Sequence, residues 1–129
     1  MTAQDRWVRA DGKRPITEAG CAASSINERT WSTYAAVSAS KAGDGMGVML
    51  GGGLGCYDLD GCLVDGQLTD EARRIIAAIT APILYTEISV SGRGLHIFTA
   101  EPEGPGAELE WGGHYTRSRF IRTTGNTWR

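Results

Sequence analysis

The sequence is poor in lysine and cysteine and has no long apolar run, and each shortage excludes a class of protein. Its 129 residues hold two lysines and three cysteines. No apolar segment approaches the roughly 20 residues of a membrane-spanning helix, and no GxxxxGK[ST] phosphate loop or N-terminal signal peptide is present. The cysteines lack CxxC spacing, so we expect reduced thiols, with zinc binding as a less favoured alternative. These absences predict a soluble cytoplasmic protein without a motor module or membrane contact.

Charge is distributed unevenly along the chain. The net charge of −2 argues against strong autonomous nucleic-acid binding, because such proteins usually carry a basic face. Residues 1–41 hold six basic and four acidic residues, residues 42–116 hold three and eleven, and residues 117–129 hold four arginines and no acid. The centre, at −8, has the charge that a cation site requires, although solvated surface carboxylates account for most of it. The basic end is a template contact, a docking point or a solvated terminal strand.

Hydrophobic periodicity and Gly/Pro breaks predict a single α/β (α+β) domain over residues 1–129, with a mixed sheet flanked by helices. Residues 1–20 are expected to form an extended, partly packed N-terminal arm. One helix is expected after a cap at Asn27 or Thr30, and a clearer one after Thr69 or Asp70. The expected strands are 48–50, 54–59, 83–90, 95–99, 109–111 and 120–123. The predicted core residues are Leu50, Leu59, Ile75, Ile76, Ile79, Ile97 and Phe120.

The end of the 54–59 strand carries an acidic pair. Side chains alternate across a strand, so Asp58 and Asp60 are expected on one face, with Tyr57 and Leu59 on the other. Two close carboxylates repel each other, and a divalent cation such as Mg²⁺ neutralises them. The competing interpretation is that Asp60-Gly61 is an ordinary turn.

A glycine-rich turn precedes the first of the two histidines. In SVSGRGLHIF, residues 89–98, Gly92 and Gly94 allow a tight turn whose amide N–H groups are able to face phosphate oxygens. Ser91 and Arg93 add donors, and His96 is held at the edge of the turn, where an imidazole is able to donate to a triphosphate. Taken alone, the pattern also fits an ordinary hairpin with a core histidine.

A later segment combines acids, aromatics and arginines. Glu108 and Glu110 offer a third carboxylate, while Trp111 and Tyr115 are candidates for base stacking or for the core. Arg119 lies in the following basic run, where phosphate contact is expected.

Read together, these segments resemble a known family. The resemblance rests on KRP, NERTW, GVMLGGGLGCYDLDGCL, YTEISVSGRGLHIF and RFIRTTGN, in that order from Lys13 to Asn126. They are similar to the bifunctional primase-polymerase domain of phage and plasmid replication proteins, in the archaeo-eukaryotic primase superfamily. The strongest pieces are the DxD strand end and the SGxGxH turn, each weak alone and strong as an ordered pair.

The resemblance implies an RRM-like catalytic core that joins nucleotides on a single-stranded DNA template with two Mg²⁺ or Mn²⁺ ions. Asp58 and Asp60 match the family's first-motif metal ligands, and His96 matches its phosphate-binding histidine. Glu110 matches the third acidic motif best, with Glu108 as the alternative. The residues expected at the nucleotide, by motif or by location, are Ser91, Gly92, Arg93, Gly94, His96 and Arg119. The implied setting is the cytoplasm of a bacterial host, with a helicase or accessory primase subunit as partner.

Three other interpretations compete. DLDGCLVDG also resembles the nucleophile motif of haloacid-dehalogenase-type phosphatases, but Cys62 stands where threonine is usual and no lysine follows Lys41. A dinucleotide-binding site at residues 51–55 would require a helix after the glycines, where a strand is expected. A non-catalytic primase-like module that binds nucleic acid or protein is the more serious alternative. The retention of Asp58, Asp60 and His96 disfavours it, because converging carboxylates repel a phosphate backbone unless a metal is present.

Overall fold

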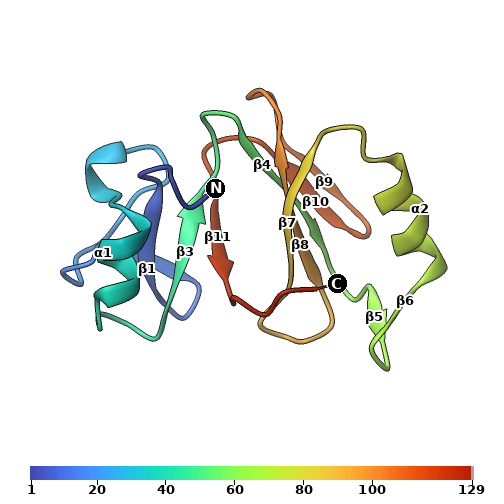
Figure 1. The fold of residues 1–129 in the computed structure, drawn as a ribbon, viewed down its shortest axis with the longest axis horizontal. Coiled ribbons are helices and arrows are strands. Elements are labelled where there is room, and N and C mark those ends of the chain that lie inside the picture. Colours follow the sequence, from blue (N-terminus) through green and yellow to red (C-terminus); the bar gives the residue numbers. More distant parts are fainter. Residues whose placement is uncertain (129) are drawn as a thin grey trace.

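The computed structural model describes residues 1–128 and is a sheet-dominated α+β fold (Figure 1). One sheet contains β1 (Trp7–Asp11), β2 (Arg14–Ile16), β3 (Gly45–Met49) and β11 (Phe120–Thr123). A second contains β4 (Leu54–Leu59), β7 (Ile83–Ile88), β8 (Leu95–Ala100), β9 (Ala107–Leu109) and β10 (Gly112–Tyr115), and a small hairpin contains β5 (Leu63–Val64) and β6 (Gln67–Leu68). The helical elements are a 3₁₀ turn, η1 (Glu28–Thr30), and the helices α1 (Tyr34–Ala39) and α2 (Asp70–Ala78).

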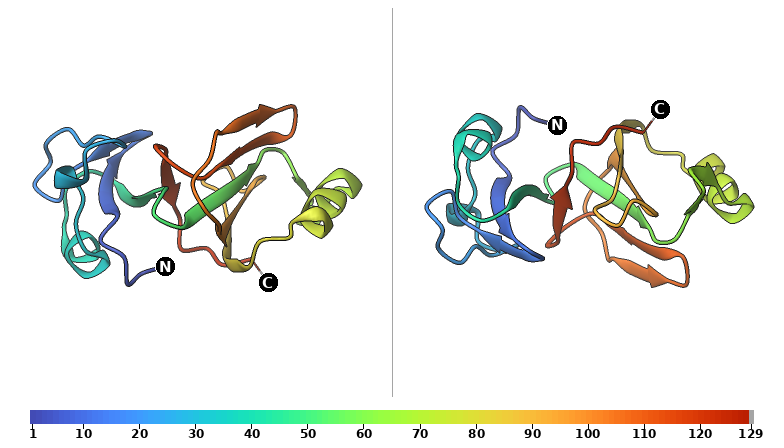
Figure 2. Two further views of the ribbon diagram at one scale, coloured as in Figure 1. Left: turned by 90° about the horizontal axis from the view of Figure 1, so that it is seen from above. Right: turned by 90° about the horizontal axis from the view of Figure 1, so that it is seen from below.

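The two larger sheets have the strand orders β11-β3-β1-β2 and β7-β8-β4-β10-β9. Every pair in them is antiparallel, so the expected single mixed sheet is replaced by two antiparallel ones. The turn at residues 51–53 joins β3 to β4, as predicted, but it also carries the chain from one sheet to the other. Because a strand follows these glycines, the dinucleotide fingerprint is absent there. Figure 2 shows β11, at the edge of its sheet, lying between the two sheets.

The N-terminal segment differs from the expected extended arm. Its residues form the β1–β2 hairpin, which turns at Gly12, a glycine with φ of +61°. Trp7, Val8 and Ile16 are buried. A three-residue strand is too short to give a clear period-2 pattern, which explains why periodicity missed this hairpin.

The first helix starts later than predicted, whereas the second agrees. Asn27 caps only the 3₁₀ turn, and α1 begins after Thr33, whose hydroxyl accepts a hydrogen bond from the Ala36 N–H. Thr69 caps α2 in the same way, by accepting from the Ala72 N–H. A side-chain oxygen at this position satisfies one of the unpaired N–H groups of a helix start.

Two apolar clusters hold the fold together. One lies between the sheets and contains Trp7, Val37, Val48, Leu50, Leu54, Cys56, Phe98 and Ile121. The other lies between the second sheet and α2 and contains Leu59, Cys62, Leu63, Ala72, Leu95 and Ile97. Leu50, Leu59 and Ile97 are buried as predicted, and the α2 isoleucines are partly buried. The prediction that Phe120 lies in the core is wrong by one residue, because its neighbour Ile121 is the buried one and Phe120 is only partly buried.

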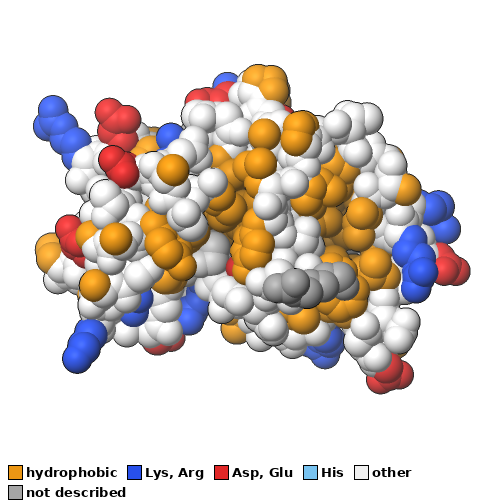
Figure 3. All heavy atoms as spheres, in the orientation of Figure 1, with side chains coloured by type: hydrophobic (Ala, Val, Ile, Leu, Met, Phe, Trp, Pro, Cys, Tyr) orange, Lys and Arg blue, Asp and Glu red, His pale blue; other side chains and the backbone are white. Residues whose placement is uncertain are grey.

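Apolar side chains also reach the surface. Figure 3 shows hydrophobic atoms gathered over the middle of one face, with most charged side chains nearer its rim. Ile83, Leu84 and Val90, on and just after β7, are among the exposed large apolar residues. Within residues 1–128, no helix is long and apolar enough to cross a membrane.

Candidate active site

The central strand of the second sheet separates two environments. Cys56 belongs to the cluster that faces the first sheet, whereas Leu59 belongs to the cluster that faces α2. Because side chains alternate, Asp58 lies on the face of Cys56, and Tyr57 lies on the face of Leu59. We call the first the acidic face and the second the aromatic face.

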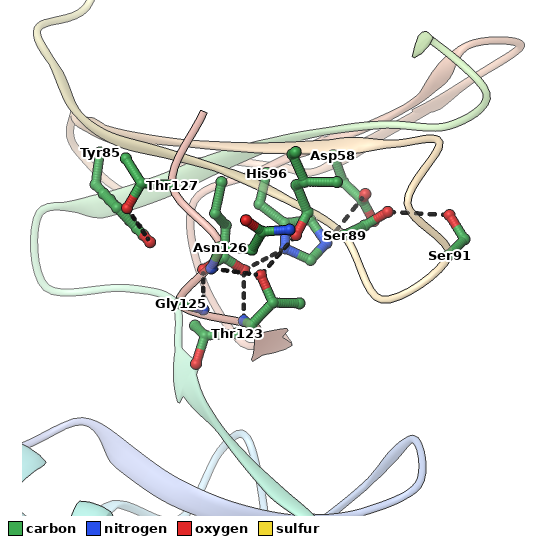
Figure 4. A network of polar contacts seen from close by, with 12 residues as sticks. Asp58, Tyr85, Ser89, Ser91, His96, Thr123, Gly125, Asn126 and Thr127 are labelled. Carbon is green, nitrogen blue, oxygen red and sulfur yellow. Dashed lines mark hydrogen bonds and ion pairs between the residues drawn. The ribbon is translucent and has the colours of Figure 1, made fainter. Parts of the chain in front are cut away.

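Three polar side chains form a row across the acidic face. Asp58 on β4 is paired with His96 on β8, which is paired with Glu87 on β7. The His96 Nε2 atom lies 3.6 Å from Asp58 Oδ1, and His96 Nδ1 lies 3.0 Å from Glu87 Oε2. Figure 4 shows His96 between Asp58 on one side and Gly125 and Asn126 on the other. Strand pairing therefore brings together Asp58 and His96, which the sequence motifs assign to one site.

Glu87 is the member of this row that sequence reasoning missed. Its side chain is 0% exposed, and its carboxylate also accepts hydrogen bonds from the backbone N–H groups of Thr124 (2.9 Å) and Gly125 (3.1 Å). Buried carboxylates are rare unless they are paired and hydrogen-bonded. The available sequence signal is that Glu87 is the only charged residue of the strand Ile83–Ile88, which indicates a carboxylate with a specific partner.

The electrostatics of the acidic pair favour a cation. Burial raises the pKa of Asp58, and the Asp60 carboxylate raises it further, while His96 and Arg119 lower it. Asp60 follows the last residue of β4 and is exposed, with its backbone N–H donating to Trp111 O at 2.7 Å. A divalent cation beside these carboxylates would offset both the burial of Asp58 and the repulsion from Asp60. The donor set of this strand end therefore fits Mg²⁺ or Mn²⁺.

The register reverses the preference between the two candidates for a third carboxylate. Gly113 on β10 is paired with Asp58 on one side and with Glu108 on the other, so Glu108 extends the row on the acidic face. Glu110 lies in the exposed turn between β9 and β10, where a strand was predicted over residues 109–111. That turn takes Glu110 out of the alternation of the sheet.

Tyr115 and Arg119 lie beside these carboxylates. A Cβ atom on Gly113 would lie 2.4 Å from the Tyr115 ring, so the ring covers this glycine. The Arg119 guanidinium lies 4.1 Å from the ring centroid. Burial raises the pKa of the Tyr115 phenol, Arg119 opposes the rise, and the carboxylates of Glu108, Asp58 and Asp60 add to it. The charges of one arginine and three carboxylates thus act on the phenol of a single aromatic ring.

The turn at residues 89–94 contains more internal hydrogen bonds than expected. The Gly92 N–H donates to Ser89 O at 2.9 Å, and the Arg93 N–H donates to Ser91 Oγ at 3.2 Å. These two amides are used within the turn and do not face a ligand, in contrast to the prediction. Gly94 is buried, and it packs so closely against β4 that a Cβ atom there would lie 2.6 Å from Leu59 O. The exposed donors of the turn are the side chains of Ser91 and Arg93.

Trp111 lies with the aromatic face, away from the acidic row. Its ring is stacked with Tyr57 at a centroid distance of 6.5 Å and packs on the cluster near α2. This contact favours a core role over base stacking. Cys56 and Cys62 are buried free thiols, and Cys21 is an exposed one. Within residues 1–128, no group of three His, Cys, Asp or Glu side chains is close enough to form a metal site by itself.

A cavity among the described residues lies next to this row and includes only its Glu87 end. It has a volume of about 970 Å³ and is lined by residues of both sheets, among them Trp7, Tyr85 and Glu87. Neither Asp58 nor His96 lines it. We assign the candidate active site to the acidic row because the cavity offers no second carboxylate beside Glu87 except Asp44, which is bound to Arg122.

Comparison with known proteins adds no assignment, since no family model matches the chain and no curated protein matches it significantly.

Proposed function

We propose that the chain is a template-directed nucleotidyltransferase, a DNA primase or polymerase of the primase-polymerase type with an RRM-like catalytic core. The observation that carries the proposal is the row of Asp58, His96 and Glu87 across one sheet face. The motif resemblance predicts a metal carboxylate and a phosphate-binding histidine side by side, and strand pairing brings these two residues together. Neighbouring antiparallel strands also suit such a core.

Asp58 and Asp60 are the proposed ligands of two Mg²⁺ or Mn²⁺ ions, with Glu108 as the preferred third ligand and Glu110 as the alternative. Ions bound there supply charge neutralisation for the attacking oxygen and the leaving pyrophosphate.

The remaining side chains are assigned to the triphosphate. His96 Nε2 lies 3.6 Å from Asp58, so a phosphate held by this nitrogen is next to the proposed metal ligands. Arg119 lies beside the same carboxylates, and Ser91 and Arg93 provide exposed donors on the adjacent turn. Their combined role is to position the nucleotide and stabilise charge, as phosphoryl transfer requires. A single-stranded DNA template and a helicase or accessory primase subunit are the proposed partners.

Primer extension tests the proposal. The wild type is compared with the Asp58→Asn/Asp60→Asn double variant on a labelled primer and single-stranded DNA, with nucleotides and Mg²⁺ or Mn²⁺. We expect the double variant to lose at least about 100-fold in rate, because metal ions contribute several kcal/mol to such reactions. Glu101→Gln, a change to a carboxylate on the aromatic face, is the matched control and retains activity within about twofold.

Binding of Mn²⁺, followed by titration calorimetry, separates the possible failures. If the wild type binds the ion through Asp58 and Asp60 but does not extend, the site is supported and a partner subunit is required. If it neither binds the ion nor extends a primer, the nucleotidyltransferase is refuted and the non-catalytic module replaces it.

A further inference from the structure

We propose that Glu87 is a positioning residue that fixes the ring of His96 so that its Nε2 atom faces the nucleotide, and that the 124–125 backbone holds Glu87 in place. The role of His96 at the phosphates rests on the proposed function, and the role of Glu87 adds to that function. The geometry of the pair stands without that function.

The pair has the geometry of a donor held by a fixed acceptor. The 3.0 Å contact between His96 Nδ1 and Glu87 Oε2 requires a hydrogen on Nδ1, since a carboxylate only accepts. On the other side of the ring, the 3.6 Å separation of Nε2 from Asp58 is too long for a hydrogen bond. Nδ1 is therefore engaged, and Nε2 remains available to another partner.

Glu87 is in turn anchored from a distant part of the chain. Its Oε2 accepts from the Thr124 N–H and its Oε1 accepts from the Gly125 N–H. The same loop is fastened to β7, because the Thr124 hydroxyl donates to Ile88 O at 2.6 Å and the Ile88 N–H donates to Asn126 O at 2.8 Å. The carboxylate thus accepts three hydrogen bonds and has little freedom to rotate, so the ring direction of His96 is set by the segment that follows β11.

Only a carboxylate fits this position. A glutamine has one acceptor oxygen and one NH₂ donor. If its oxygen faced His96 and Thr124, its NH₂ group would meet the Gly125 N–H; if it were turned over, the NH₂ group would meet the Thr124 N–H and His96 Nδ1. Either orientation sets donor against donor, which leaves a buried polar group unsatisfied. Glu87→Gln therefore weakens the hold on Nδ1–H with almost no change of shape, because only one of its two orientations offers that hydrogen an acceptor.

A charged acceptor also suits the task proposed for His96. Because Glu87 engages Nδ1, the Nε2 edge of the ring, which lies toward Asp58, is the edge left for a phosphate oxygen. Carboxylates that orient a metal-ligating histidine commonly change affinity or activity by 10- to 100-fold when replaced, and Glu87 holds the ring of His96 in the same manner.

Nuclear magnetic resonance of the imidazole nitrogens tests the positioning without any nucleotide. The chain contains two histidines, so His114→Gln assigns both. We expect His96 in the wild type to show a protonated, slowly exchanging Nδ1–H, and Glu87→Gln to lose it. Glu101→Gln makes the same chemical change at the other carboxylate–histidine pair, where Glu101 Oε1 lies 2.8 Å from His114 Nε2, and is expected to alter only the His114 signals.

Steady-state primer extension supplies the second readout. We expect Glu87→Gln to raise the nucleotide KM about tenfold and to lower kcat by a smaller factor, whereas Glu101→Gln leaves both unchanged. A wild-type His96 that lacks a proton on Nδ1 overturns the proposal, and this measurement does not depend on whether the variant folds. An unchanged KM in a folded Glu87→Gln also overturns it. If neither the wild type nor any variant extends primers, Mn²⁺ binding decides between a missing partner subunit and failure of the proposed function, while the imidazole spectra still decide the role of Glu87.

Discussion

Both faces of the second sheet carry a carboxylate–histidine pair, yet the surroundings of the two pairs differ. On the acidic face, Glu87 is fully buried and bound to backbone N–H groups, and His96 lies next to Asp58. On the aromatic face, the Glu101 side chain is 15% exposed and His114 stacks on Tyr57 at a centroid distance of 3.9 Å. The first pair orients a ring toward other charges, whereas the second packs a ring against an aromatic neighbour.

A histidine and its carboxylate do not by themselves mark a functional site, because the two pairs share this chemistry but not their surroundings. On the acidic face, the charges of Asp60, His96 and Arg119 all act on the pKa of Asp58. Near the other pair, the Thr99 hydroxyl donates to Glu101, which satisfies this carboxylate locally. Like charges left close together are tolerated mostly where a ligand or metal compensates them. The repulsion between Asp58 and Asp60 is therefore the reason for choosing the acidic face as the candidate site.

Two adjacent glycines on β10 allow the faces to be disturbed separately, and Gly112 gives the largest expected effect on stability. It has φ of +141°, and a Cβ atom there would lie 1.8 Å from Asp58 O. We expect Gly112→Ala to lower the free energy of unfolding by about 3 kcal/mol or more, because a backbone atom cannot move aside and the conformation is strained for alanine. Urea denaturation measures the loss.

Gly113→Ala is the matched change, since its Cβ atom would meet the ring of Tyr115, which is able to rotate. We expect a loss of only about 1 kcal/mol, together with a displaced Tyr115. Equal losses in the two variants would show that the contact with Asp58 O does not constrain β10.

Much of the second sheet was predictable from sequence, because its strands carry clear signals. Leu54–Leu59 and Leu95–Ala100 are apolar runs bounded by glycines, and the Thr69 cap marks the start of α2. Local rules of this kind depend on a few neighbouring residues, so one sequence is enough to apply them. The β1–β2 hairpin and the start of α1 have weaker local signals, and the predictions for these two segments were wrong for that reason.

The candidate site was predictable only in part, because register is a long-range property. Alternation along β4 predicted that Asp58 and Asp60 share a face, but nothing local indicates that Glu108 is paired through Gly113 with Asp58. A shift of one residue would have placed Glu108 on the other face. The role of Glu87 was not predicted for a related reason, because its hydrogen-bond partners, Thr124 and Gly125, lie 37 and 38 residues away in the chain.

Arg119 offers a smaller test of the acidic face. Its guanidinium lies on the Tyr115 ring and lowers the pKa of Asp58. We expect Arg119→Gln to raise the nucleotide KM about tenfold, which corresponds to roughly 1.4 kcal/mol, a usual value for a lost charge-assisted contact. Arg117→Gln, a change to an exposed arginine two residues away, is the control and leaves KM within about twofold. A KM that responds equally to both changes would indicate general attraction between charges and no specific phosphate contact.

The smallest expected effect is a gain in stability from removing one charge of the acidic row. Burial and Asp60 raise the pKa of Asp58 in the folded protein, so its ionised form is less favourable there than in the unfolded chain. Above the folded pKa this reduces the free energy of unfolding, and the reduction disappears as the pH falls below the ordinary value of about 3.9 for aspartate. We therefore expect Asp58→Asn to be more stable than the wild type at pH 7 by about 1 kcal/mol, as is common when a site charge is neutralised. Thermal unfolding between pH 3 and pH 7 measures the difference, which should shrink toward acid. An Asp58→Asn protein that is less stable at pH 7 would mean that the contact with His96 outweighs burial, and the acidic face would then resemble the self-satisfied pair on the aromatic face.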